Sequence, residues 1–196
     1  TPAASSQAAE VFLSALPNSV SVTTLELFDT DLPDVTENVV NAKFKFAMGA
    51  DLTAAEAAEW KAIRDLVDEF VSAESFLFGV PMWNFSIPYR MKQYIDLITH
   101  PGLTFARDEN GMRGLASGSA TVIYSRGGDY SPKNGEPDPY DFQSPYFKAW
   151  LGLVGVGPVN EVLVQNTAGG PDAQKAAVEA ARQQLESLAS GTSGRS

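Results

Sequence analysis

The sequence predicts an α/β protein built on a doubly wound parallel sheet. Segments with helical spacing alternate with short apolar runs along the 196 residues, which is the order expected when helices connect parallel strands. Two of the runs, Ser75–Val80 and Ser119–Tyr124, show little alternation of polar and apolar residues, as strands do when both faces of a sheet are covered. In such a sheet, ligands bind outside the carboxyl ends of the strands.

Helices are predicted where apolar residues recur every three or four positions. The segment Ser5–Leu16 places Ala8, Phe12 and Leu16 on one face. Thr53 and Glu56 form a capping-box pattern that opens a helix ending near residue 72. Further helices are predicted at 39–46, 87–100, 140–153 and 171–188. His100, at the end of one of them, is interpreted as a C-terminal residue that contacts the last carbonyl groups of its helix.

Strands are predicted where β-branched residues cluster between turn residues. Val20–Leu27 alternates and is rich in such residues, and Val159–Val164 forms the last apolar run. The chain opens with a helix, whereas a complete doubly wound unit opens with a strand. We therefore expect the natural chain to carry a further N-terminal strand of roughly ten to fifteen residues, ending in serine.

Composition limits the possible partners and the location of the protein. The formal net charge of −10 argues against a nucleic-acid or anionic-membrane partner, because phosphate backbones need a basic face. The absence of cysteine from the sequence excludes disulfides and thiol nucleophiles. No apolar run reaches transmembrane length, and a cytoplasmic location is predicted. We expect one domain over residues 1–189 and a disordered tail over 190–196.

Two consecutive buried strands end in loops that are candidates for ligand binding. Pro81–Phe85 follows the first strand and places Met82, Trp83 and Phe85 on a connection, where large apolar residues are unusual. The loop packs under a neighbouring element, makes a dimer contact, or forms a wall and amide cradle for a flat aromatic ligand. Ser125–Gly128 follows the next strand. It is either an ordinary turn or a place where glycines let the backbone approach a ligand.

A third candidate is the N-terminal end of the first helix. Ser5 or Ser6 could act as a helix cap, and the free amides and dipole of this helix end also suit a phosphate. The acidic residues between Asp29 and Glu37 do not have the spacing of a calcium-binding loop, so they are interpreted as a solvated acidic segment.

A set of short motifs resembles the FMN-dependent NADH-azoreductases, which are flavodoxin-like quinone reductases. The order and spacing of the motifs agree over nearly the whole chain. The motifs are Pro81-Met82-Trp83-Asn84-Phe85, Lys92-x-Tyr94-x-Asp96, Gly102-x-Thr104-Phe105, Glu109-Asn110-Gly111, Gly114-Leu115, Ser125-Arg126-Gly127-Gly128, Pro145-Tyr146 and Leu151-Gly152.

The resemblance implies a flavodoxin-like sheet of strand order 2-1-3-4-5, with the first strand missing from this chain. Either the chain is a fragment, which we favour, or FMN binding is impaired. It also implies a homodimer that transfers two electrons from NADH or NADPH, through FMN, to quinones and azo compounds in a ping-pong cycle. The cofactor-binding residues that it implies are Ser5, Met82, Trp83, Asn84, Phe85, Ser125, Arg126, Gly127 and Gly128. No acid–base residue is expected. The alternatives are a flavodoxin-like electron carrier and a non-catalytic flavin-binding module.

Two structural expectations accompany this resemblance. Pro81–Phe85, Phe44–Met48 and Leu103–Phe105 are expected to form a symmetric dimer interface, because exposed apolar patches of this kind are rare on monomers. A side chain at Gly127 or Gly128 is expected either to clash with the flavin ring or to strain the backbone, and a positive φ is expected at Gly127.

Overall fold

The computed structural model describes residues 2–192, whose elements alternate as the sequence predicts. The helices are α1 (Ala4–Ser14), α2 (Glu37–Met48), α3 (Ala54–Ser72), α4 (Tyr89–Ile98), α5 (Ser144–Val154) and α6 (Pro171–Ser190), with a 3-10 turn η1 (Thr167–Gly169). The strands are β1 (Ser75–Pro81), β2 (Phe105–Asp108), β3 (Gly111–Gly114), β4 (Ser119–Ser125) and β5 (Val159–Val164). The predicted tail, 190–196, falls largely outside the described residues.

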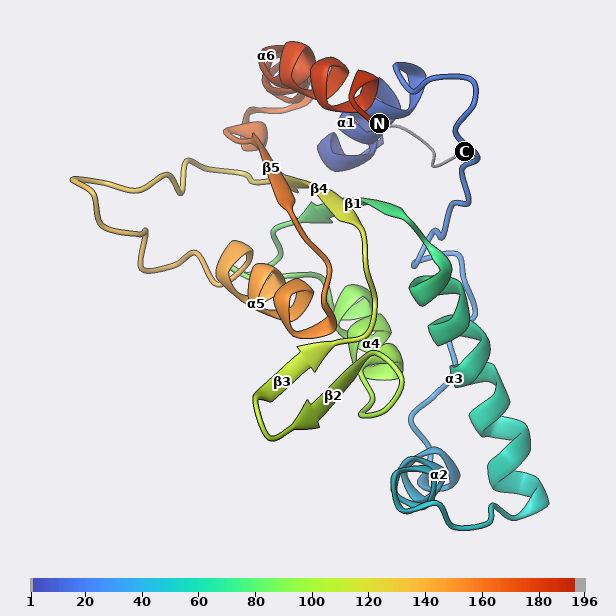
Figure 1. Cartoon of the computed structure of the whole chain (residues 1–196). Helices are drawn as coiled ribbons and strands as arrows, with labels where there is room; N and C mark the ends of the chain where they lie inside the picture. The colour runs from blue at the N-terminus through green and yellow to red at the C-terminus, as the bar shows by residue number, and fades with distance from the viewer. Residues whose placement is uncertain (1, 193–196) are drawn as a thin grey trace.

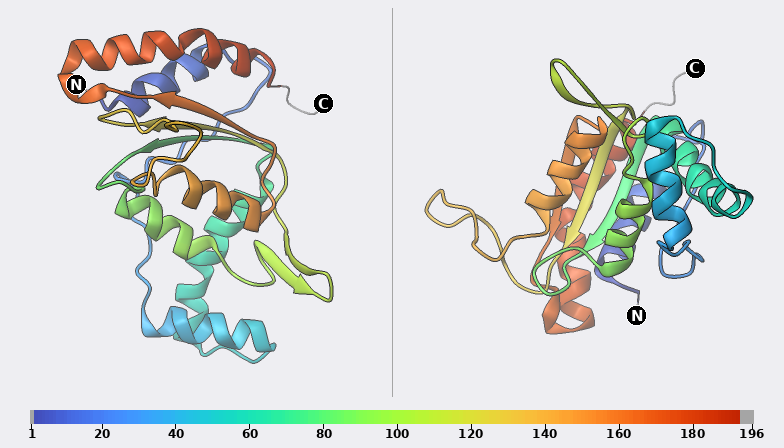
Figure 2. Two further views of the ribbon diagram at one scale, coloured as in Figure 1. Left: turned by 90° about the vertical axis from the view of Figure 1, so that its left-hand side faces the viewer. Right: turned by 90° about the horizontal axis from the view of Figure 1, so that it is seen from below.

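A parallel sheet forms the centre of the molecule. Its three strands lie in the order β1-β4-β5, with Ser75 opposite Ser119 and Ala120 opposite Val159. Helices α1 and α6 cover one face, whereas α4 and α5 cover the other (Figures 1 and 2). Because the strands are parallel, their carboxyl ends meet at one edge of the sheet.

Each face of the sheet has its own apolar core. Ile123 and Val162 pack against α1 and α6, where Phe12 and Leu185 are buried. On the opposite face, the buried core is larger and draws on α3, α4 and α5. Adjacent residues of β4 thus serve opposite cores, which explains the missing alternation in this strand.

Helices α2 and α3 form a hairpin that leads away from the sheet (Figure 1). The predicted capping box is confirmed: Thr53 accepts a hydrogen bond from the Glu56 amide, and the Glu56 carboxylate accepts one from the Thr53 amide. The same carboxylate lies 2.7 Å from Nζ of Lys45 on α2. One glutamate therefore starts α3 and joins it to α2. None of the helices of residues 2–192 is long and apolar enough to cross a membrane.

The predicted strand at Val20–Leu27 is wrong. This segment has no regular structure up to residue 26 and then enters a turn. Its backbone finds no partner strand, because β4 takes the paired edge of β1 and no described strand lies on the other edge. Side chains of α4 hold the end of the segment instead: Arg90 Nε donates to the Leu27 carbonyl at 2.8 Å.

A second difference is the antiparallel hairpin of β2 and β3, a segment for which no strand is predicted from the sequence. Asn110-Gly111 was the available signal, since this pair favours hairpin turns. The hairpin packs closely on the end of α5. A Cβ atom added to Gly114 would lie 2.0 Å from the backbone nitrogen of Gly155.

This contact predicts opposite effects for two glycine-to-alanine substitutions. Gly114→Ala should destabilise the fold by about 1–3 kcal/mol, because backbone atoms of Gly155 occupy the space that the new methyl group needs. Gly152 lies within α5 and has open space around it. Gly152→Ala should therefore stabilise the fold by roughly 0.5–1 kcal/mol. Urea denaturation of both variants measures the difference in stability. Equal urea midpoints for the two variants would mean that Gly114 is not packed closely against Gly155.

His100 is buried beneath the α2–α3 hairpin. It is 3% exposed, and its ring centroid lies 4.9 Å from that of Trp60. Its Nε2 atom lies 2.7 Å from the Leu97 carbonyl, which confirms the predicted contact with the end of its helix. Its Nδ1 atom has no hydrogen-bond partner among residues 2–192. Burial, with a smaller contribution from the charge of Lys43, lowers the pKa of His100 to about 4.

The lowered pKa predicts a pH-dependent stability. The unfolded chain takes up the histidine proton at about pH 6.5, whereas the folded chain resists it until about pH 4. Stability is therefore full above pH 6.5 and falls towards pH 4, with a slope of up to about 1.4 kcal/mol per pH unit. This is the chain's one histidine, so His100→Gln should flatten the stability profile between pH 7 and pH 5. If equilibrium denaturation of His100→Gln gave the same dependence of stability on pH as the unmodified protein, His100 would not be the source of that dependence.

Candidate functional site

The loop after β1 is an exposed tight turn. Trp83 and Ser86 exchange two backbone hydrogen bonds, of 2.8 and 3.1 Å. Between them, Asn84 and Phe85 have φ values of 48° and 71°. Such a turn favours asparagine at the first position and glycine at the second. A phenylalanine with positive φ is therefore strained, and strain of this kind concentrates at ligand-binding sites.

The side chains of this turn face solvent. Trp83 is 45% exposed and Phe85 is 44% exposed, so neither is buried under a neighbouring element of the described chain. The amides of Asn84 and Phe85 have no acceptor among residues 2–192. The turn therefore offers two apolar surfaces and two free donors in one place.

The loop after β4 lies beside the first. The Met82 amide donates to the Ser125 carbonyl at 2.8 Å, so the two loops start from adjacent backbone positions. The carbonyl groups of Gly127 and Gly128 accept from Ala168 and Asn166. The amides of the two glycines have no acceptor in the described part of the chain.

The expectation of a positive φ at Gly127 is wrong. Neither Gly127 nor Gly128 is among the residues with positive φ. A Cβ atom at Gly127 would lie 3.5 Å from Cβ of Ala168, which is an ordinary contact distance. The backbone strain at this edge of the sheet belongs to Asn84 and Phe85, and the glycines instead leave the surface in front of their amides uncovered.

Arg126 is buried and paired within the protein. It is 2% exposed, and its Nη2 atom donates to the Asp141 carboxylate at 2.8 Å. Its Nε atom donates to Oε1 of Gln143 at 2.9 Å. Burial raises the pKa of Asp141, but hydrogen bonds from Ser144 and the charge of Arg126 outweigh it, so this pKa lies below its usual value. The guanidinium group thus joins the loop after β4 to the segment before α5, and it does not face the surface.

The N-terminal end of α1 lies at the same edge as the arrowheads of β1 and β4 (Figure 2). Ser5 is buried against β1: its Cβ atom would lie 3.6 Å from a Cβ placed on Gly79. No side chain caps this helix end, and the Ser5 hydroxyl has no partner among the described residues. The first amides of α1 also lack intrahelical acceptors, so this end suits an anionic group.

Further exposed aromatic rings flank the turn on both sides. The ring centroid of Trp83 lies 5.3 Å from that of Phe28 and 6.3 Å from that of Tyr89. On the other side, the ring centroids of Tyr140 and Phe85 lie 5.2 Å apart. The sequence analysis missed Phe28, Tyr89 and Tyr140, because residues distant in sequence meet here. Phe28 follows a predicted strand, whereas Tyr89 and Tyr140 lie at the starts of predicted helices, so no common signal in the sequence pointed to this site.

The arrangement suits a flat ring with apolar faces and a polar edge. Trp83 and Phe85 supply apolar surface, and free amides in both loops supply donors for ring oxygen or nitrogen atoms. The N-terminus of α1 supplies donors for a negatively charged group. No group of three or more metal-ligating side chains occurs in residues 2–192.

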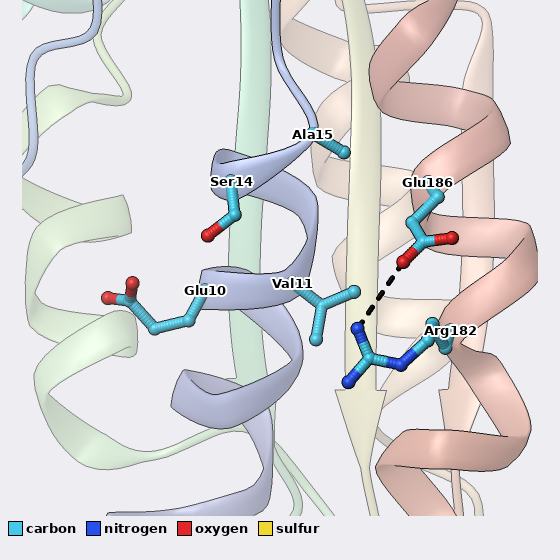
Figure 3. Close-up of a pocket in the computed structure, with 6 residues that line it drawn as sticks. All are labelled: Glu10, Val11, Ser14, Ala15, Arg182 and Glu186. Carbon is cyan, nitrogen blue, oxygen red and sulfur yellow. Dashed lines mark hydrogen bonds and ion pairs between the residues drawn. The ribbon is translucent and has the colours of Figure 1, made fainter.

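A separate groove between α1 and α6 does not have these properties. It has a volume of about 310 Å³ and is lined by Glu10, Val11, Ser14, Ala15, Arg182 and Glu186 (Figure 3). Arg182 pairs with Glu186 at 3.3 Å and with Glu179 at 2.8 Å. Two carboxylates of its own helix therefore already pair with this guanidinium group, and no aromatic ring of the described residues lines the groove.

Comparison with known proteins identifies the family of the chain. Residues 1–189 match a protein family described by its flavodoxin-like fold. The chain is 38% identical over 171 residues to "FMN-dependent NADH:quinone oxidoreductase 3" of Pseudomonas fluorescens, covering 86% of this chain and 79% of that protein. It is 40% identical over 179 residues to the FMN-dependent NADH:quinone oxidoreductase of Nitratidesulfovibrio vulgaris, covering 88% and 85%. The chain belongs to this family.

Solved structures give the same result. An azoreductase from Bacillus anthracis superposes with a TM-score of 0.84 at 28% identity, covering 97% of this chain and 92% of that one. An FMN-dependent NADH-azoreductase from the same species, solved in complex with FMN, has a TM-score of 0.81 at 25% identity, covering 95% and 92%. The predicted family and the flavodoxin-like fold are confirmed.

Proposed function

We propose that this flavodoxin-like family member is an FMN-dependent oxidoreductase that uses NADH, or NADPH, to reduce quinones and azo compounds. The observation that carries the proposal is the meeting of two loops at one sheet edge, where free amides lie beside exposed aromatic rings. Curated relatives at 38% and 40% identity are named for FMN, NADH and quinone, which supports the same conclusion.

The residues of the site fit FMN. Trp83 and Phe85 would pack on its ring system, and the amides of Gly127 and Gly128 would bond the polar ring edge. The unpaired Ser5 hydroxyl and the start of α1 would hold the phosphate. Bound FMN would supply the redox chemistry of the proposed ping-pong cycle, in which two electrons pass from the reduced nicotinamide to the second substrate.

The protein contributes position and electrostatics. Amide dipoles fixed by two loops stabilise negative charge at the ring edge without rearranging during the reaction. The charge of Arg126 is shared with Asp141 at 2.8 Å, so the amides carry this role. The site contains no histidine, and the one at residue 100 is buried beneath the α2–α3 hairpin. We therefore assign no acid–base residue, and water supplies the protons of the product.

We also propose a homodimer with sites at the interface. Helix α2 presents Phe44 and Met48 at 61% and 74% exposure, and Met112 on β3 is 54% exposed. Phe44 and Met48 lie one helical turn apart and so form a continuous apolar surface on α2, and continuous exposed apolar surface is typical of association sites. Thr104 is fully buried, so the β2–β3 hairpin would contribute Met112 to the interface in preference to the expected Leu103–Phe105 segment.

The proposed activity is tested on the purified protein supplemented with FMN. The flavin absorbance near the visible maximum should disappear on anaerobic addition of NADH and return on addition of a quinone. An electron carrier would require a protein reductant, and a binding module would not be bleached. Persistent absorbance with both NADH and NADPH would contradict the proposal.

Phe85 and Asn84 offer a matched pair for testing the turn. Glycine at either position relieves a positive φ, so neither substitution should cost more than about 0.5 kcal/mol of stability. Phe85→Gly removes the exposed ring and should weaken FMN binding about threefold to tenfold, in line with an aromatic contact of roughly 0.5–1.5 kcal/mol. Asn84→Gly keeps the ring and should bind FMN within about twofold of the unmodified protein. Flavin fluorescence titration measures both. Equal affinities in the two variants would mean that the ring does not contact FMN.

A further inference from the structure

We propose that Gln143 is a positioning residue for the FMN site, which it serves by fixing the loop after β1 relative to the loop after β4. The inference rests on the proposed function, because it concerns the site to which FMN is assigned. Gln143 is 0% exposed and precedes α5. It does not reach the surface in front of the two loops, so it acts through its neighbours.

The side-chain amide of Gln143 joins the bases of the two loops. Its Nε2 atom donates to the Val80 carbonyl at 2.8 Å, two residues before Met82. Its Oε1 atom accepts from Nε of Arg126 at 2.9 Å. Val80 and Arg126 are themselves buried, so both hydrogen bonds lie away from water. Buried bonds of this kind define geometry, because breaking either leaves an unsatisfied polar group.

The residues next to Gln143 extend this connection to the tip of the turn. The Phe142 amide donates to the Phe85 carbonyl at 3.1 Å. Asp141 pairs with Arg126 and accepts hydrogen bonds from the amides of Gln143 and Ser144. The three residues Asp141–Gln143, here called the clamp, therefore contact the base and the tip of one loop and the guanidinium group of the other.

Glutamine is the residue type that this position requires. The guanidinium group of Arg126 only donates hydrogen bonds, and the carbonyl of Val80 only accepts them. A carboxamide meets both demands at once, with one acceptor and one donor. An ionised glutamate would keep the bond to Arg126 but place a second negatively polarised oxygen against the Val80 carbonyl. Methionine would fill similar space without either bond.

The positions that depend on this geometry are the free amides. Asn84 and Phe85 lie on one loop, and Gly127 and Gly128 lie on the other. Donors on separate loops bind one rigid ring system well only when the distance between the loops is fixed in advance. The clamp provides that distance through contacts that do not include FMN.

The test compares Gln143→Glu and Gln143→Met with Leu185→Ala, a buried substitution in α6 on the opposite face of the sheet. Thermal melts of the flavin-free proteins give the loss of stability. Fluorescence titration gives the FMN dissociation constant at a temperature where each variant is folded. Visible circular dichroism of the FMN-saturated proteins reports the surroundings of the bound ring.

We expect both Gln143 variants to weaken FMN binding at least tenfold and to alter the visible dichroism. Leu185→Ala should lower the melting temperature comparably, yet keep FMN affinity within about twofold and leave the dichroism unchanged. Should Gln143→Glu not fold, Gln143→Met carries the same comparison. Affinity and dichroism like those of Leu185→Ala would overturn the inference. Failure of the unmodified protein to bind FMN would instead overturn the proposed function.

Discussion

The need to pair a buried guanidinium group organises the functional edge of this protein. Taking an arginine out of water costs several kcal/mol unless every donor finds a partner. Arg126 offsets this cost by bonding one acceptor through each of its three nitrogen atoms: Asp141 and Gln143 before α5, and Gln165 after β5. Removing one partner of such a group typically costs about 3–5 kcal/mol. The conformation of the loop after β4 is therefore stable only together with the segment before α5 and the end of β5.

The same pairing explains why the helix before β5 starts later than the sequence suggests. Tyr140 and Phe142 continue the apolar pattern of α5 and were included in the predicted helix. The Asp141 carboxylate instead accepts hydrogen bonds from the amides of Gln143 and Ser144, which satisfies the first free donors of the helix. Periodicity did not distinguish this from a longer helix, because the deciding partner, Arg126, lies 15 residues earlier in the chain.

Local patterns predicted most of the fold, and the failures have a common physical cause. Thr53 and Glu56 specified the start of α3, and the apolar runs of β1, β4 and β5 specified the sheet, since both signals depend on neighbouring residues. Val20–Leu27 has an equally good strand pattern but no partner strand. Strand formation needs hydrogen bonds from another segment, so its own sequence could not determine the outcome.

The candidate site was predictable in position but not in conformation. The order of strands and two motifs placed the loops Met82–Phe85 and Ser125–Gly128 together, and the structure joins them through the Met82 amide and the Ser125 carbonyl. Glycine content suggested that the strained backbone lay at Gly127, whereas it lies at Asn84 and Phe85. A turn that holds phenylalanine at positive φ needs support from outside the turn. That support comes from the Phe142 amide, which bonds the Phe85 carbonyl from a segment far along the chain.

The strained turn and the free amides at this edge of the sheet both require a rigid backbone. Four amides, at Asn84, Phe85, Gly127 and Gly128, have no acceptor among the described residues, and a flexible loop would relax until such donors met nearby carbonyl groups. The turn at Trp83–Ser86 and the contacts of Asp141–Gln143 prevent this relaxation, because they use the carbonyl groups of Val80, Trp83 and Phe85 in other hydrogen bonds. The donors remain directed at solvent for a ligand to use. The buried hydrogen bonds around Arg126 thus keep the loops in a conformation in which these amides stay free. Without them, the amides would bond to nearby carbonyl groups and would no longer be available to a ligand.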